Sequence, residues 1–193
     1  MAVDCFNDRK FIHRPWYHFP KLPALPHPGE KLHNRYFNQF IYADAAFSKF
    51  CVIEHKARNI KDYKQEEAIQ SVNELIGILY CEPEKFDEQL ITDRGLIMAN
   101  QVEEFQKAVI LHTFANVREY IVKHRCPTLF PSGGDDDTER PPVYTGETWY
   151  YLRFDVSETP TFQGMETTRK AWIYEVLDLL EKKARESAKP QKA

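Results

Sequence analysis

The sequence predicts a mainly α (α+β) fold. We expect a bundle of about five helices around a central helix near 96–125, one short β element near 148–156 and a long irregular N-terminal arm. Three observations predict this. Apolar residues recur every three or four positions over most of the chain after residue 30. The stretch 97–125 keeps this rhythm on two stripes without Gly or Pro, as in a helix covered on two sides. Five prolines lie between positions 15 and 28, where no helix can continue.

Length and composition fit one globular domain with extensions, at 193 residues, 42% hydrophobic and 28% charged. We expect an extended arm over 1–30, a helical domain over 31–186 with a mobile loop at 131–142, and a polar tail over 187–193. The net charge of −3 gives no general attraction to nucleic acid. No run approaches the roughly 18 apolar residues of a membrane span. The four cysteines form no CxxC pair, which indicates reduced thiols in an intracellular compartment.

The N-terminal arm combines prolines with large side chains. Because proline removes backbone donors and favours extended geometry, such a segment is suited to lie along a surface. Aromatic and arginine side chains are the usual anchors of protein interfaces. The arm residues expected to bind a partner are Phe11, Arg14, Trp16, Tyr17, Phe19 and Leu22. The alternative is that the arm packs on its own domain.

Helices are predicted over about 30–56, 63–80, 83–91, 96–125 and 166–186. The second has the clearest pattern, since Asp62 and Gln65 fit a capping box before a regular apolar stripe. Pro83 suits the first turn of the third. Within the central helix, the apolar run Ala108–Leu111 also fits a short strand, so a strand over 107–114 is the alternative there.

Residues 148–156 are the one predicted strand. Tyr150, Leu152, Phe154 and Val156 alternate with Trp149, Tyr151, Arg153 and Asp155. A single strand needs a pairing partner. The options are residues 128–130, residues 142–144 or another chain. Trp149 and Tyr151 are expected to contribute to a partner-binding surface.

The sequence contains no nucleotide-binding loop, nucleophile elbow or HExxH motif. Two Cys/His pairs, one a helical turn apart and one at the end of the central helix, give a weak candidate for a tetrahedral metal site. These residues are Cys51, His55, His124 and Cys126. A weaker set joins His13 and His18 to Cys5. We expect neither metal nor cofactor, and we interpret Asp135–Asp137 as a solvated acidic loop.

The favoured function is therefore a non-catalytic structural or assembly subunit, whose arm and aromatic surfaces bind other protein subunits or further copies of the chain. An accessory subunit of an organellar complex and a phage structural protein would both fit. One alternative is an enzyme or small-ligand protein with a pocket near His112, Tyr120 and Trp149. Another is a nucleic-acid-associated protein that uses the basic, aromatic arm.

Overall fold

The computed structural model describes residues 17–23, 25–57, 65–130 and 146–188. In this part of the chain the structure is mainly helical, and its one β-type pairing is an antiparallel bridge between Tyr36 and Trp172. The α-helices are α1 (Phe37–Ala57), α2 (Gln65–Leu79), α3 (Ile91–Gln101), α4 (Glu104–Tyr120), α5 (Gly146–Ser157), α6 (Met165–Arg169) and α7 (Ile173–Ser187). Short 3₁₀ turns occupy Glu30–Leu32, Pro83–Lys85 and Glu88–Leu90, and α4 continues into a π-helical turn, Ile121–Arg125.

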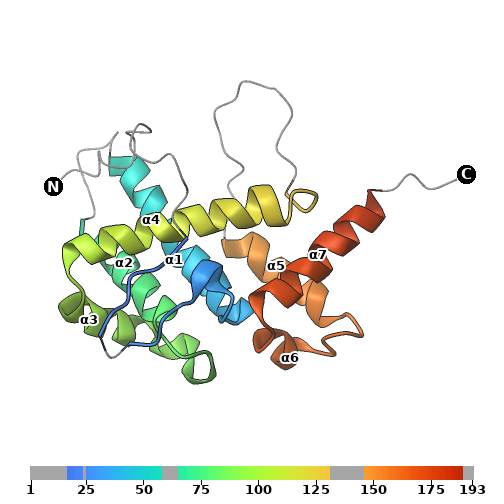
Figure 1. Ribbon diagram of the computed structural model, residues 1–193, viewed down its shortest axis with the longest axis horizontal. Coiled ribbons are helices and arrows are strands. Elements are labelled where there is room, and N and C mark those ends of the chain that lie inside the picture. The colour runs from blue at the N-terminus through green and yellow to red at the C-terminus, as the bar shows by residue number, and fades with distance from the viewer. Residues whose placement is uncertain (1–16, 24, 58–64, 131–145, 189–193) are drawn as a thin grey trace, which may run out of the picture.

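Helix α4 runs across one side of the molecule, from the end formed by α2 and α3 to the end formed by α5 and α7 (Figure 1). Helix α2 packs against both α1 and α3, and α1 also contacts α5, α6 and α7. Two glycines permit a close approach of α2 and α3. A Cβ atom on Gly77 would lie 3.2 Å from the backbone of Arg94, and one on Gly95 would lie 3.1 Å from the backbone nitrogen of Glu74.

The centre of the core is Trp149, which is fully buried. Its ring meets Phe40 at 4.9 Å and Phe130 at 5.1 Å between centroids, in T-shaped contacts. The Trp149 indole N–H donates to the buried Asp44 carboxylate at 3.0 Å, and the same carboxylate accepts from Arg118 Nε at 2.5 Å. A single buried carboxylate of α1 thus joins α4 and α5.

The predicted strand over 148–156 is wrong, because these residues form helix α5. The buried positions are Trp149, Arg153 and Val156, which recur at helical spacing. Since the middle one is an arginine, the buried stripe does not look apolar in the sequence. The alternation of Leu152, Phe154 and Val156 with Arg153 and Asp155 resembles a strand instead. Burial of Arg153 depends on its hydrogen bond to the Asn38 side chain of α1.

The prediction of a single central helix over 96–125 is also wrong, because these residues belong to two helices, α3 and α4, separated at Val102 and Glu103. Val102 is extended and buried. Glu103 then starts α4 with a capping box, in which Gln106 accepts the Glu103 backbone N–H at 3.2 Å. No Gly or Pro marks this break. The strand alternative over 107–114 is wrong too, since these residues lie within α4.

Other helix boundaries differ from the predictions to a smaller degree. Helix α2 confirms the predicted helix over 63–80, whereas the helix over 83–91 is replaced by two 3₁₀ turns. The helix predicted from residue 30 starts at Phe37, after Lys31 and Leu32 with positive φ. The last predicted helix is interrupted between α6 and α7, where Phe37 N–H donates to the Ala171 carbonyl at 2.8 Å.

Candidate protein-binding surface

The described part of the N-terminal arm, residues 17–23 and 25–30, packs on the chain's own core. Phe19 and Leu22 are buried, and the Tyr80 hydroxyl donates to the Pro20 carbonyl at 2.7 Å. Tyr17 is half-buried against the Tyr120 ring, with 5.5 Å between centroids. The side chains of Phe19 and Leu22 are therefore occupied within the domain and are not available on its surface.

The remaining arm candidates, Phe11, Arg14 and Trp16, lie outside the described residues, as do Cys5, His13 and Asp135–Asp137. Their partner-binding and nucleic-acid-binding roles stay predictions. The same holds for the expected loop over 131–142 and for the cellular compartment. None of the described helices has the length and apolar character to cross a membrane.

The four weak metal candidates do not come together. Cys51 is exposed on α1, whereas Cys126 is fully buried after the π-helical turn and donates its thiol to the Leu177 carbonyl at 3.8 Å. Burial raises the pKa of the Cys126 thiol to about 12, so the thiol is protonated at neutral pH. Within the described residues, no three His, Cys, Asp or Glu side chains gather as ligands would.

Of the three residues predicted near a pocket, His112, Tyr120 and Trp149, the structure removes Trp149. Trp149 has no exposed surface, so it cannot line an opening. Tyr120 is covered by Tyr17 and by Lys31, whose Nζ lies 4.1 Å from the Tyr120 ring centroid. His112 is half-buried on α4, and burial lowers the pKa of its imidazole.

Helix α5 instead exposes three large aromatic side chains, Tyr150, Tyr151 and Phe154, which we term the α5 aromatic cluster. Their exposed fractions are 44%, 68% and 41%. The rings are contiguous, since Tyr150 lies 6.4 Å from Tyr151 and 4.9 Å from Phe154 between centroids. Only Tyr151 was among the predicted binding residues. Reading 148–156 as a helix would have grouped all three, because positions three and four apart share a face.

Arg153, on the buried side of α5, contacts the Tyr150 ring of the cluster. This arginine is only 2% exposed, and its guanidinium carbon lies 4.7 Å from the Tyr150 ring centroid. Arg153 Nη1 donates to the Asn38 side-chain oxygen at 2.5 Å, which ties α5 to α1. The Tyr150 ring therefore packs on a buried, hydrogen-bonded arginine, and it loses little conformational entropy when it binds a partner.

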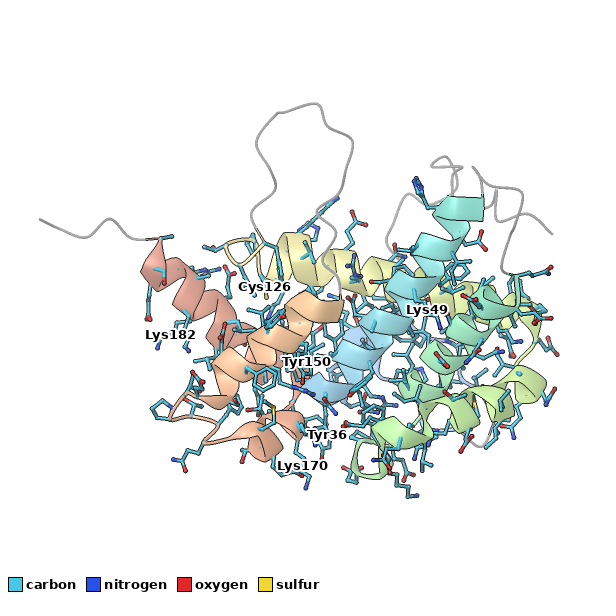
Figure 2. All side chains as sticks on the ribbon, turned by 180° about the vertical axis from the view of Figure 1, so that it is seen from behind. Tyr36, Lys49, Cys126, Tyr150, Lys170 and Lys182 are labelled. Atoms are coloured by element: carbon cyan, nitrogen blue, oxygen red, sulfur yellow. The ribbon has the colours of Figure 1, made fainter. Side chains whose placement is uncertain are left out.

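A polar hollow of about 780 Å³ lies beside this arginine, between the start of α1, the segment 83–90 and α6. Its lining includes Tyr36, Asn38, Phe86, Glu88, Arg169 and Lys170. Asn38 connects the hollow to Arg153 of α5. Figure 2 shows Tyr150, Tyr36 and Lys170 on the same side of the molecule. The aromatic cluster and the hollow thus share one polar network.

No protein-family model matches the chain, and neither the curated proteins nor the solved structures include one similar enough to indicate a relationship.

Proposed function

We propose that this protein is a non-catalytic subunit or adaptor that binds another protein through the α5 aromatic cluster. The observation that carries the proposal is the exposure of three contiguous aromatic rings on one helix. Tyrosine and phenylalanine bury large areas and lose little conformational entropy, which is why aromatic residues are enriched at interfaces. An isolated exposed ring is ordinary, whereas a contiguous group on a fixed support is typical of a binding surface.

The charges around the cluster favour a protein partner. Asp155 and Glu158 are exposed on α5 and just beyond it, and the whole chain has a net charge of −3. Phosphate backbones and acidic lipid headgroups would be repelled by these carboxylates. In a two-fold contact of α5 with a second copy, the same carboxylates would approach one another, which is unfavourable. We therefore assign the surface to a different protein that presents apolar side chains.

The test compares three forms of the full chain. In the first, Tyr151→Ser and Phe154→Ser remove two rings of the cluster. The second carries Phe105→Ser, which removes a ring that is 77% exposed on α4 and serves as the matched control. The third is the unchanged protein. Each is used to capture partners from the native source, and the affinity of any captured protein is then measured by calorimetry after purification.

The expected result is a protein bound by the unchanged chain and by the Phe105 variant. Its affinity for the double variant should fall by roughly a hundredfold, since each of the two lost aromatic contacts contributes about 1.4 kcal/mol, or roughly tenfold. Equal binding by all three forms would refute the proposal. If the purified unchanged protein sediments as a dimer and the double variant as a monomer, the partner bound by the α5 aromatic cluster is a second copy of this chain and not a different protein.

A further inference from the structure

The network beneath the α5 aromatic cluster contains more positive than negative charge. Arg153 reaches Asn38, and the Asn38 amide donates to Glu88 Oε2 at 3.2 Å. Arg169 of α6 donates to Glu88 Oε1 at 3.3 Å. Arg169 therefore contacts Glu88 directly, whereas Arg153 is linked to the same carboxylate only through Asn38. Arg153 and Asn38 are buried, so solvent screens the charge of Arg153 only weakly, whereas Arg169 and Glu88 are 37% and 31% exposed.

Both arginines also hold an unused donor. The Nε atoms of Arg153 and Arg169 are buried and have no hydrogen-bond partner. Buried donors are normally satisfied, and an unsatisfied one costs free energy. The hydrogen bonding of these arginines thus lacks one feature, an acceptor for their Nε–H groups.

Arg125 shows how this chain satisfies an arginine of similar exposure. The Arg125 side chain is 36% exposed, against 37% for Arg169. Arg125 donates to both oxygens of Asp178, from Nε at 2.9 Å and from Nη2 at 2.6 Å. Arg169 has one long bond to Glu88 and a second carboxylate, Glu166, only at 3.9 Å. Its fork of donors is therefore largely unfilled.

The surroundings restrict which anion fits. Glu166 lies 3.0 Å from Lys170, and Lys85 lies 2.5 Å from Glu82, so these two lysines already have acidic partners. The remaining charged residues that line the hollow are Glu84 and Asp87. They oppose any anion, and a dianion such as phosphate more strongly than a singly charged group. Tyr36 and Phe86 provide aromatic surface in the same lining.

We propose that the hollow between the segment 83–90 and α6 binds a carboxylate attached to an apolar body, held by the Nε–H and Nη–H groups of Arg169. The Arg153 guanidinium supplies positive charge behind it, and the neutral Asn38 amide connects Arg153 to Glu88. The Arg169 side chain is 37% exposed and lines the hollow, but its Nε atom is buried, so binding through Nε–H requires the side chain to rotate. The carboxylate belongs either to a free small molecule or to an acidic side chain of a protein. This assignment does not depend on partner binding at α5.

The first arm of the test uses 3-phenylpropionate as a free probe. Isotope-labelled full-length protein is titrated while the arginine Nε–H signals are followed by NMR. The uncharged amide of the probe, inorganic phosphate and chloride at equal ionic strength are the controls. We expect saturable shifts with the carboxylate alone. Arg169→Gln should weaken binding at least about tenfold, whereas the matched variant Arg125→Gln should leave it unchanged.

The second arm uses a short acetylated and amidated peptide with one glutamate between two phenylalanines, against the same peptide with glutamine. Binding that requires both the glutamate and Arg169 assigns the site to an acidic side chain of a protein. Binding of the free probe alone assigns it to a small molecule. The proposal is overturned if neither ligand binds, if phosphate binds as well, or if Arg169→Gln changes nothing. The α5 variants remain a separate test of the proposed function.

Discussion

The buried carboxylate of Asp44 should be among the most sensitive positions for stability. It is fully buried and accepts hydrogen bonds from Arg118 Nε at 2.5 Å and from the Trp149 indole at 3.0 Å. Asp44→Ala leaves the Trp149 N–H without a partner inside the core, at a cost of about 1–3 kcal/mol. It also removes the carboxylate that faces Arg118, a side chain that is 23% exposed and partly reaches solvent. Loss of one partner from a buried ion pair costs about 3–5 kcal/mol, and we expect a value in that range.

Urea unfolding followed by circular dichroism measures this cost. Asp44→Asn keeps one acceptor oxygen, but its NH₂ group then faces either the Arg118 or the Trp149 N–H donor. The loss of unfolding free energy should therefore be smaller for Asp44→Asn than for Asp44→Ala. Asp155→Ala, on the exposed side of α5, is the control and should stay within about 0.5 kcal/mol of the unchanged protein. The reasoning is refuted if Asp44→Ala costs less than about 1 kcal/mol, or if Asp155→Ala costs as much.

Three further predictions concern stability. Gly77→Ala and Gly95→Ala should each lower the unfolding free energy by about 1–2 kcal/mol, although alanine favours helices by about 1 kcal/mol, because the added Cβ meets backbone of the facing helix; a stabilised variant in thermal unfolding would contradict this. Burial raises the pKa of the Glu181 carboxyl. Hydrogen bonds from Leu129, Thr128 and Arg185 together lower this pKa by more than burial raises it, so the pKa lies below its ordinary value of 4.5. Glu181 therefore stabilises the fold above about pH 4.5 and loses this effect as the pH falls, and the difference between Glu181→Gln and the unchanged protein should shrink in acid unfolding series. Tyr80→Phe removes the bond to the Pro20 carbonyl, should cost about 0.5–1.5 kcal/mol, and should speed amide exchange around residues 17–23; unchanged exchange would show that this bond does not hold the segment.

Some of the fold could be predicted because its signals are local. The apolar stripe of α2 and its polar opposite face specify a helix from spacing alone, and the structure confirms it at Gln65–Leu79. The prolines before residue 29 exclude a helix there, and Glu30–Leu32 is only a short 3₁₀ turn. Helix propensity, apolar spacing and the backbone restriction at proline act within a few residues, so they can be recognised from a single sequence.

The candidate surface could be predicted only in part. Tyr151 was expected on a binding surface and is exposed, but its neighbour Trp149 forms the centre of the core. Neither spacing nor composition distinguishes these two aromatic residues until the phase of α5 is known. That phase depends on burying Arg153, which requires the Asn38 side chain of α1 to meet it.

What the sequence alone determined is the class of this protein: a mainly helical domain, net acidic, with an excess of aromatic side chains and none of the catalytic motifs sought. Only the tertiary structure decided that 148–156 is a helix, that Trp149 is core, and that Arg153, Asn38, Glu88 and Arg169 share one network. The physical reason is that burial of a charged side chain is permitted by partners distant in the sequence. Such partners leave no local pattern, and they become visible only when α1, α5, α6 and the segment 83–90 meet in space.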